Sequence, residues 1–343
     1  MGAFISRLIE FCSNKPEHID DDLSNSFVEI DSINSEDSLI ISDDDTFGTD
    51  IAFDNFDDDD NISLVETTEE EEEEEEDTNE FIYTYTNEKQ ALLIGINYNE
   101  DDFKGDDLNG CVNDMNNLKS FLINKCHFLA EDVKTLCNNE ATRENIQNEL
   151  SKLVVFSHLN PGSEIWLSYS GHGSNITSFT EDDFKSEVIC PSDYSTNGII
   201  TDEWIQDNFV KGLEKTTKVF VLMDCCNSGS NLNLPYRFKF GDICVQDTSY
   251  TQEELDNLCY IVKISGCEDD QTSADYFERN ENEFQGALTN GFLTFSEKVN
   301  SNHNNITFFY NNVLSYLTYR GFTQRPVLSF SKSELLESKL FKC

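Results

Sequence analysis

Residues 218–229 read Lys218-Val219-Phe220-Val221-Leu222-Met223-Asp224-Cys225-Cys226-Asn227-Ser228-Gly229. The apolar run in the first half is typical of a central parallel strand that is covered on both faces. The run ends abruptly in an aspartate, two thiols and a turn of small polar residues. Because ligands and chemistry gather at the carboxyl ends of strands in open α/β sheets, we expect a functional site at this end.

A second stretch upstream has the same design. Residues 164–173 read Glu164-Ile165-Trp166-Leu167-Ser168-Tyr169-Ser170-Gly171-His172-Gly173, an apolar run that ends in a histidine between two glycines. If these two strands are neighbours in the sheet, a histidine and a cysteine meet at one rim. A cysteine beside a histidine is the arrangement that activates a thiol as a nucleophile.

The rest of the chain, from about residue 80 onward, predicts alternating strands and helices. Strands are expected at 91–97, 133–137, 258–265 and 326–330, and helices at 108–122, 143–154, 202–211, 286–299 and 309–319. Thr142 is the expected N-cap of the helix that follows it. Residues 174–197 are expected to form a loop and residues 235–257 a linker. This alternation predicts an α/β fold with a mostly parallel central sheet and helices on both faces.

The formal net charge of -44 is concentrated in the first quarter of the chain. Residues 17–80 contain neither Lys nor Arg and include a run of glutamates, Glu69 to Glu76. High net charge with few large apolar residues predicts a disordered acidic segment. Nucleic acid is not an expected partner, because phosphate binding needs clustered Lys and Arg.

Targeting signals are sparse. Met1 to Ser6 match the N-myristoylation pattern, and Cys12 is a candidate for a second lipid, although a chance match to so short a pattern is an equally good interpretation. A secretory signal and a membrane-spanning apolar run are both absent from the sequence. The 11 scattered cysteines favour free thiols in a reducing compartment. We expect a cytoplasmic protein that contacts membranes only through a myristoylated Gly2.

Several motifs occur in a fixed order along residues 88–330. They are the strand ends 169–173 and 224–229, together with 110–114, 187–191, 234–236, 265–275, 286–289 and 324–329. In these motifs the chain resembles the type I metacaspases, a family of caspase-like cysteine peptidases. The resemblance implies a caspase-like three-layer sandwich. It also implies a prodomain (1–80), a large-subunit region with the catalytic dyad (81–240) and a small-subunit region that completes the same domain (241–343).

The resemblance implies a cysteine endopeptidase, and it suggests a role for each residue at the strand ends. The family pattern Asp-x-Cys-His-Ser-Gly places the nucleophile at Cys226, with Cys225 as a packing thiol and Asn227 in place of the usual histidine. His172 is then the general base, and the backbone N–H groups of Gly173 and Cys226 form the oxyanion hole. A core histidine and a core cysteine without chemistry are the structural alternative, but turns at strand ends favour catalysis.

The resemblance also implies a primary specificity pocket, formed by Cys111, Asp114, Ser170 and Asp224. Two carboxylates at the base of a narrow slot select a cation, so peptide or protein substrates are expected to be cleaved after Arg or Lys. The structural alternatives are a solvated helix residue for Asp114 and a strand-end cap for Asp224.

Calcium is the one expected cofactor, and no organic cofactor is expected. The family's four carboxylate positions fall on Ser186, Asp202, Glu203 and Asn233, so two carboxylates are replaced. Because calcium prefers several anionic oxygens, these replacements are expected to weaken the site or move it. Carboxylates nearby that can substitute are Asp182, Asp183, Glu187 and Asp193; Glu187, Asp202 and Glu203 are the candidate metal ligands.

Self-processing of a zymogen is expected at Arg237, Lys239 or Lys263, because residues 16–88 contain neither Lys nor Arg. The alternative function is a catalytically idle scaffold of the same fold, whose acidic tail recruits basic partners. The presence of both His172 and Cys226 favours the enzyme.

Overall fold

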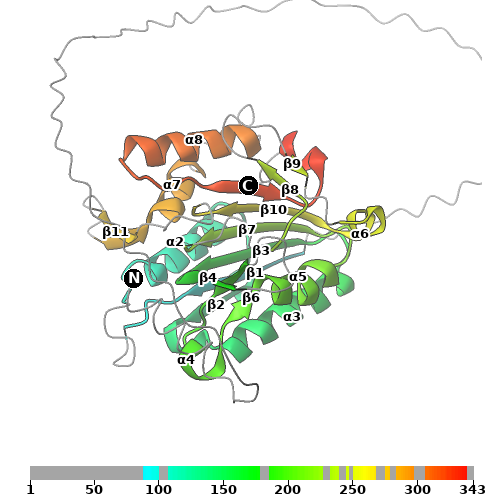
Figure 1. Ribbon diagram of the computed structural model, residues 1–343, viewed down its shortest axis with the longest axis horizontal. Helices are drawn as coiled ribbons and strands as arrows, with labels where there is room; N and C mark the ends of the chain where they lie inside the picture. The colour runs from blue at the N-terminus through cyan, green and yellow to red at the C-terminus, as the bar shows by residue number, and fades with distance from the viewer. Residues whose placement is uncertain are drawn as a thin grey trace, which may run out of the picture. The chain divides into compact units, whose positions relative to one another are not determined.

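The computed structural model describes residues 88–99, 107–177, 185–226, 232–238, 245–246, 250–267, 275–278, 283–296 and 306–337. These residues belong to one compact unit, in which helices cover both faces of a central sheet (Figure 1). The predicted acidic prodomain and the lipidation site at Gly2 lie outside the described residues and stay predictions. In the described part of the chain, every helix is too short or too polar to cross a bilayer.

The central sheet places the two functional strands side by side. Its strands are β1 (Lys89–Gly95), β2 (Val133–Cys137), β3 (Glu164–Ser170), β7 (Lys218–Asp224), β8 (Tyr236–Phe238), β9 (Val245–Gln246), β10 (Tyr260–Ser265) and β13 (Val327–Phe330). Their spatial order is β2-β1-β3-β7-β10-β13-β8-β9. The pairs from β2 to β10 are parallel, and β13, β8 and β9 add an antiparallel side. The mostly parallel sheet predicted from the sequence is confirmed.

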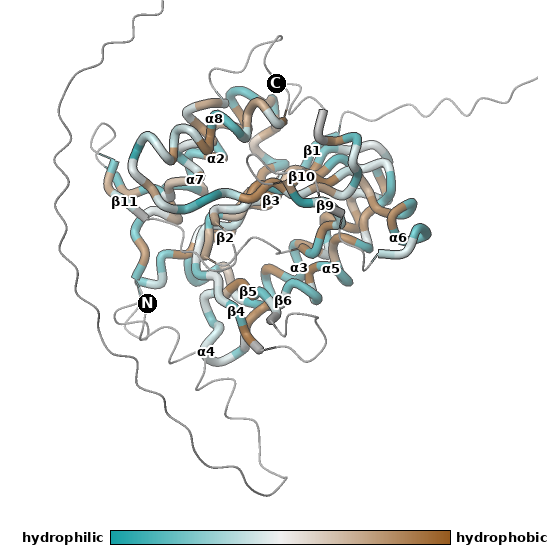
Figure 2. The backbone as a smooth tube through the Cα atoms, turned by 45° about the horizontal axis from the view of Figure 1, so that its top comes forward, coloured by the Kyte–Doolittle hydropathy of each residue, from teal (hydrophilic) through white to brown (hydrophobic). Residues whose placement is uncertain are grey.

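Helices bury both faces of this sheet. Helices α3 (Arg143–Leu159) and α5 (Asp202–Asn208) lie on one face, and α2 (Cys111–Asn124), α7 (Ala287–Ser296) and α8 (Ile306–Tyr319) on the other (Figure 1). A hydrophobic core lies on each face of the sheet. Leu92 and Ile94 of β1 pack into the core on the α3 side, and Ala91 and Leu93 pack into the core on the α2 side. Burial on both faces explains why the central strands are continuous apolar runs, which Figure 2 shows in brown.

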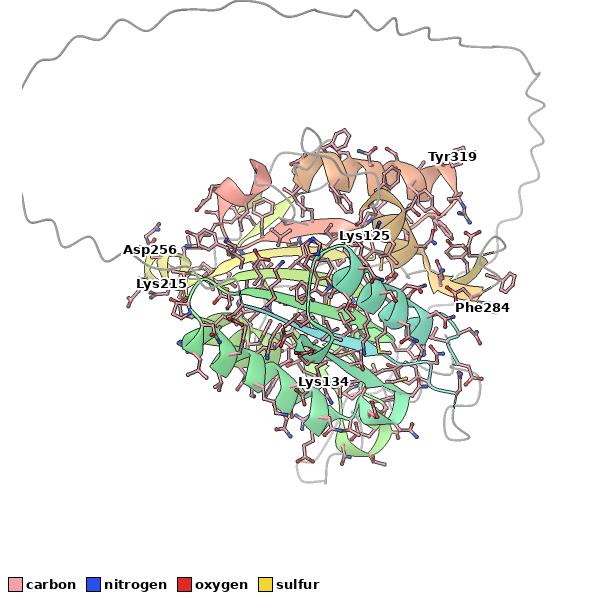
Figure 3. All side chains as sticks on the ribbon, turned by 180° about the vertical axis from the view of Figure 1, so that it is seen from behind. Lys125, Lys134, Lys215, Asp256, Phe284 and Tyr319 are labelled. Atoms are coloured by element: carbon pink, nitrogen blue, oxygen red, sulfur yellow. The ribbon has the colours of Figure 1, made fainter. Side chains whose placement is uncertain are left out.

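The boundaries of the helices follow local signals where such signals exist. The Oγ1 atom of Thr142 accepts a hydrogen bond from the backbone N–H of Asn145 at 3.2 Å, so the predicted N-cap is confirmed. Helix α8 begins at Ile306, three residues before the predicted start. Two of the large exposed apolar side chains are Tyr319, the last residue of α8, and Phe284 on a hairpin (Figure 3).

Two predictions about irregular segments were wrong. Residues 174–197, predicted as a loop, contain most of β4 (Gly173–Thr177), β5 (Lys185–Ile189) and α4 (Tyr194–Asn197); β4 and β5 join β6 (Ile200–Thr201) in a separate three-stranded sheet. The predicted linker at 235–257 contains β8, β9 and α6 (Gln252–Asn257). A further hairpin, β11 (Asp275–Glu278) with β12 (Glu283–Gly286), had no predicted counterpart. Strands of two to five residues are too short for a reliable apolar alternation, and partners distant in sequence stabilise them.

Most of the cysteines that the structure describes are free, as expected. Among the described residues the free thiols belong to Cys111, Cys137, Cys190, Cys225, Cys226, Cys259 and Cys267. Cys126 is disulfide-bonded, which corrects the expectation of free thiols throughout the chain.

Candidate active site

The register of two neighbouring strands brings the predicted dyad to one rim of the sheet. Strands β3 and β7 run parallel, and Ser170 lies opposite Asp224 at their carboxyl ends. His172 lies two residues after the end of β3, and Cys226 lies two residues after the end of β7. Both side chains are partly exposed, whereas the strand residues before them are buried. The polar ends of two buried strands therefore meet where a substrate can reach them.

Gly173 packs directly against the backbone of Cys226. A Cβ atom added to Gly173 would lie 2.3 Å from the carbonyl oxygen of Cys226 and 3.2 Å from Sγ of Cys225. Real Cβ atoms do not approach backbone oxygen so closely, so the two strand ends can meet only because this residue has no side chain. The chain then leaves the rim as β4, whose first residue is Gly173.

The two adjacent thiols differ sharply in environment. Cys225 is 1% exposed, and burial, aided by the nearby thiol of Cys267, raises its pKa well above the ordinary thiol value. The Sγ of Cys267 donates a hydrogen bond to the carbonyl oxygen of Cys225 at 3.5 Å. Cys226 is partly exposed. Because the thiolate is the reactive form, Cys226 is the member of the pair that is suited to nucleophilic attack.

The backbone of His172 is fixed by two groups from neighbouring elements. Its carbonyl oxygen accepts a hydrogen bond from Oη of Tyr169 at 2.8 Å and another from the backbone N–H of Cys190 at 3.1 Å. Burial raises the pKa of the Cys190 thiol, and the charge on Cys226 raises it further. Because Cys226 has this effect, the Cys190 thiol lies near the candidate nucleophile. Tyr169 and Cys190 were not among the predicted site residues, although each lies within a motif that carries the resemblance.

Asp114 forms one side of the predicted specificity pocket. It lies in the first turn of α2 and is 1% exposed. Its carboxylate accepts a hydrogen bond from Oγ of Ser170 at 2.7 Å and from the backbone N–H of Gly286 at 2.9 and 3.1 Å. Cys111, the first residue of α2, is buried, and its carbonyl oxygen lies against Gly95. The helix therefore starts in close contact with the end of β1.

Asp224 is the second carboxylate of the predicted specificity pocket. Its Oδ2 atom accepts hydrogen bonds from the backbone N–H and the hydroxyl of Thr289, at 2.8 and 2.9 Å. A Cβ atom added to Gly286 would lie 2.3 Å from Oδ2 of Asp224 and 2.6 Å from Oδ2 of Asp114. The two carboxylates thus lie side by side at Gly286, and each accepts hydrogen bonds from fixed donors.

Gly286 and Thr289 are functional candidates that the residue-level reasoning missed. Both lie in the motif Gly286-Ala287-Leu288-Thr289, but their contacts depend on how α7 packs against β7 and α2. A glycine directly before a helix was the one available signal. That signal does not tell which side chains the glycine approaches.

The candidate metal ligands lie on β5 and α5. Glu187 is 3% exposed and Asp202 is 1% exposed. Glu203 accepts a hydrogen bond from Oγ of Ser186 at 2.7 Å; partial burial opposes its ionisation, but hydrogen bonds from Ser186 and Thr201 lower its pKa overall. Within the described ranges, however, no three His, Cys, Asp or Glu side chains are arranged to hold a metal ion. Asp182 and Asp183 lie outside those ranges.

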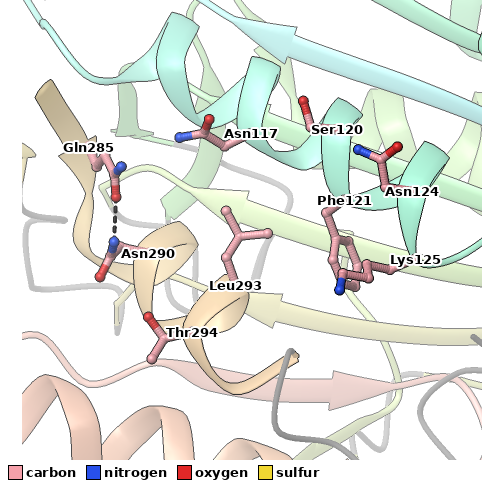
Figure 4. A pocket seen from close by; sticks show the side chains of 9 residues that line it. All are labelled: Asn117, Ser120, Phe121, Asn124, Lys125, Gln285, Asn290, Leu293 and Thr294. Atoms are coloured by element: carbon pink, nitrogen blue, oxygen red, sulfur yellow. Dashed lines mark hydrogen bonds between the residues drawn. The ribbon is translucent and has the colours of Figure 1, made fainter. Parts of the chain in front are cut away.

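A separate cavity of about 310 Å³ lies between α2, β12 and α7. Figure 4 shows its lining, which is rich in amides and hydroxyls: Asn117, Ser120, Phe121, Asn124, Lys125, Gln285, Asn290, Leu293 and Thr294. It contains none of the predicted site residues. The same three elements carry Asp114, Gly286 and Thr289, but none of these residues lines the cavity.

The predicted processing sites are placed very differently. Arg237 is partly exposed on β8, where it pairs with Ser329 of β13 and Val245 of β9. Lys263 is 0% exposed in β10, so cleavage there requires that the strand first leave the sheet, and a cut at this residue stays a prediction. Lys239 lies outside the described residues.

Comparisons with known proteins agree on one family. The family model described as metacaspase, peptidase C14 domain, matches residues 89–235. Metacaspase-3 of Trypanosoma cruzi is 33% identical over 273 residues, which cover 73% of this chain and 73% of that protein. Metacaspase-1 of Plasmodium falciparum is 33% identical over 195 residues (54% of this chain, 31% of the relative), and metacaspase-1 of Lodderomyces elongisporus is 28% identical over 301 residues (71% and 65%). The chain spans less than two thirds of the length of the latter two.

A solved structure agrees with the fold. The crystal structure of protein GSU0716 from Geobacter sulfurreducens matches with a TM-score of 0.51 and 20% identity, over 74% of this chain and 97% of that chain. At this identity the likeness concerns the fold alone.

Proposed function

The chain belongs to the metacaspase family of caspase-like cysteine peptidases, and we propose that it is an endopeptidase that cleaves peptide bonds after arginine or lysine. The observation that carries this proposal is the rim at the ends of β3 and β7. There, a partly exposed thiol and an imidazole lie beside two buried, hydrogen-bonded carboxylates.

Cys226 and His172 supply the nucleophile and the general base. The imidazole takes the proton of the Cys226 thiol, and the thiolate attacks the carbonyl carbon of the scissile bond. The imidazolium then returns the proton to the leaving amine, and an acyl-enzyme remains on Sγ until water hydrolyses it. Burial of Cys225 supports this assignment, because its raised pKa keeps that thiol protonated.

The oxyanion of the tetrahedral intermediate is stabilised by backbone N–H groups of Gly173 and Cys226 in this proposal. Support comes from the close approach of the two residues, which brings both backbones to one point of the rim. Donors fixed by packing need no reorganisation during the reaction, which makes such stabilisation effective.

The acidic pocket selects the residue before the scissile bond. Asp114 and Asp224 flank Gly286 side by side, and Ser170 and Thr289 hold their carboxylates in place. A guanidinium or ammonium group neutralises this pair, whereas an acidic or apolar side chain leaves buried charge uncompensated.

Calcium stimulation is a further part of the proposal. Glu187 and Asp202 support it, since two buried carboxylates at the end of the β4–β5–β6 sheet supply hard oxygen donors. The described residues alone do not complete a calcium site, so no step of the peptidase reaction is derived through the ion.

We also propose that the protein resides in the cytoplasm, which the free thiols of the described residues support, whereas the disulfide at Cys126 does not. Self-processing at Arg237 completes the proposal. Arg237 is partly exposed on a three-residue strand near the antiparallel end of the sheet. Its neighbours Tyr236 and Phe238 pack against Phe330 and Tyr310, so a cut after Arg237 requires local detachment of this strand. Intact-mass analysis of the purified zymogen tests it. A cut after Arg237 that Cys226→Ala abolishes is expected, and cuts that persist in Cys226→Ala contradict self-processing.

The activity is tested with fluorogenic tetrapeptides that differ only in the residue before the cleaved bond, with and without calcium. Arginine and lysine peptides are expected to be hydrolysed, aspartate peptides not, and Cys226→Ala is expected to lose all turnover. Absence of turnover for every peptide and cation condition would favour the idle scaffold. Rapid cleavage of the aspartate peptide would contradict the assigned pocket.

A further inference from the structure

Tyr98 lies against the imidazole of His172, although it comes from a different part of the chain. The centroids of the two rings are 4.5 Å apart, and the ring planes are inclined by 34°. Tyr98 is 3% exposed, so its ring forms an immobile wall behind a partly exposed histidine. An imidazole with one face against a fixed ring has fewer accessible rotamers than one in solvent.

The hydroxyl of Tyr98 fixes the backbone of the same histidine. It accepts a hydrogen bond from the backbone N–H of His172 at 3.1 Å, lies 3.1 Å from Oη of Tyr169, and donates to the carbonyl oxygen of Cys190. Tyr169 in turn donates to the carbonyl oxygen of His172. Both backbone polar groups of His172 are thus held by tyrosine hydroxyls from two different segments.

The backbone of Tyr98 has a strained conformation, which the contacts around it stabilise. Its φ angle is 55°, in the left-handed region that residues other than glycine adopt at a cost in free energy. The preceding residues are tied down, because the N–H of Ile96 donates to the carbonyl oxygen of Ser170 at 3.0 Å and the N–H of Asn97 to Oδ1 of Asn138 at 2.9 Å. A conformation of this kind persists where the surrounding structure requires the side chain at one place, and here that place is His172.

We propose that Tyr98 is a positioning residue that orients the imidazole of His172 toward Cys226 and stabilises its protonated form through the ring face. The inference rests on the proposed peptidase function for its kinetic consequence, but the contact itself is independent of activity. The face of an aromatic ring attracts a cation, so an imidazolium against the Tyr98 ring is favoured over the neutral imidazole. Protonated imidazole beside the thiolate is the reactive state of the pair.

Tyr98 stays neutral among the titratable groups that surround its contact with His172. They are Tyr169 of β3, Cys190 after β5, Cys226 after β7 and Cys111 of α2. Burial, followed by the charge on Cys190, raises the pKa of Tyr98 well above its usual value, so the hydroxyl remains a donor throughout the working pH range.

Two leucine substitutions separate positioning from packing. Tyr98→Leu removes the ring beside His172. Tyr194→Leu removes an equally buried ring of the same core, which touches Tyr98 edge-on at 6.4 Å. Both variants are expected to lose thermal stability. Per folded molecule, Tyr98→Leu is expected to lower kcat about 10-fold or more with little change in KM, and Tyr194→Leu to leave kcat within about 3-fold. Tyr98→Phe keeps the ring but loses the hydroxyl that holds the His172 backbone, so its kcat is expected to lie between those of the wild type and Tyr98→Leu.

An NMR titration of His172 tests its contact with Tyr98 without any measurement of peptidase activity. The chain has 5 histidines, so the His172 ring signals are assigned by their loss in His172→Gln. The pKa of His172 is expected to fall by about half a unit in Tyr98→Leu and to stay unchanged in Tyr194→Leu. Equal His172 pKa values and equal kcat in the two leucine variants would overturn the inference. If the protein hydrolyses no peptide, the proposed function fails while the titration still decides the role of Tyr98.

Discussion

Gly173 and Cys226 meet so closely that no side chain fits between them: a Cβ atom on Gly173 would lie 2.3 Å from the carbonyl oxygen of Cys226. This contact joins the ends of β3 and β7, and the candidate nucleophile, base and oxyanion donors all depend on it. The glycine is therefore required by geometry at the rim.

Gly173→Ala is expected to separate the two strand ends. Overpacking of this kind costs about 1–3 kcal/mol of unfolding free energy, and the shifted backbone of Cys226 should lower kcat/KM by about 100-fold. Gly212→Ala is the matched control, because its added Cβ would meet only the Val154 side chain, at 3.3 Å. Urea unfolding and peptide kinetics measure both effects. Near-wild-type kcat/KM in Gly173→Ala would contradict the close approach at this rim.

Asp114→Asn is expected to remove selectivity for basic residues. The amide keeps the shape of the carboxylate but loses its charge, so kcat/KM for an arginine peptide should fall about 100-fold, which corresponds to about 2.7 kcal/mol. The same rates are measured for a peptide with citrulline in place of arginine, which has no charge to lose. A parallel loss for both peptides would mean that Asp114 acts through folding of the pocket, and not through charge.

Glu187→Gln is expected to weaken any stimulation by calcium. If Glu187 and Asp202 supply donors, the concentration of calcium that gives half-maximal activity should rise about 10-fold or more in this variant. Glu149→Gln is the comparison, because the Glu149 carboxylate lies on α3, outside the candidate metal site, and pairs with Lys152 at 2.9 Å. Identical calcium curves for wild type and Glu187→Gln would place the ion elsewhere.

Stability is expected to fall as the pH rises above about 9. Burial raises the pKa of Cys259 from 9.0 to about 12, and it raises the pKa values of Cys190 and Cys225 as well. Between pH 9 and about 12 these thiols ionise in the unfolded chain but not in the folded one, so the unfolded state binds fewer protons. Each such thiol lowers the unfolding free energy by up to about 1.4 kcal/mol per pH unit.

Cys259→Ala checks this pH dependence, because it removes one buried thiol far from the rim. The slope of unfolding free energy against pH, measured by urea unfolding at pH 8 and pH 10, should be shallower in the variant. An unchanged slope would mean that Cys259 ionises equally in both states.

The sequence predicted most of the parallel core, and the reason is physical. Strands β3 and β7 are buried on both faces, so Trp166 and Val221 lie in continuous runs of apolar residues. Such runs are typical of buried parallel strands. The helix beginning at Arg143 was predictable because Thr142 caps it. Strands β4, β5, β8 and β9 were missed because each is short and is stabilised by partners that the local sequence does not reveal.

The part of the candidate site that lies at the strand ends was predictable from the sequence, and the part that depends on long-range contacts was not. His172 and Cys226 follow two strong strand signals, and parallel neighbours end at one rim. Tyr98, Gly286 and Thr289 were not predicted, because each acts by touching a residue far away in the chain. Contacts of this kind are set by helix packing and by a strained turn, which leave no periodic pattern.

The central claim is that Cys226 is an activated thiolate beside a pocket for a basic side chain. The most direct measurement is labelling with a peptidyl-arginine chloromethyl ketone, followed by peptide mass mapping. The account predicts one label per molecule, on Cys226, with none on Cys225 and a large loss of labelling in His172→Ala and Asp114→Asn. Labelling of Cys225 or another thiol, or equal labelling after His172→Ala, would contradict it.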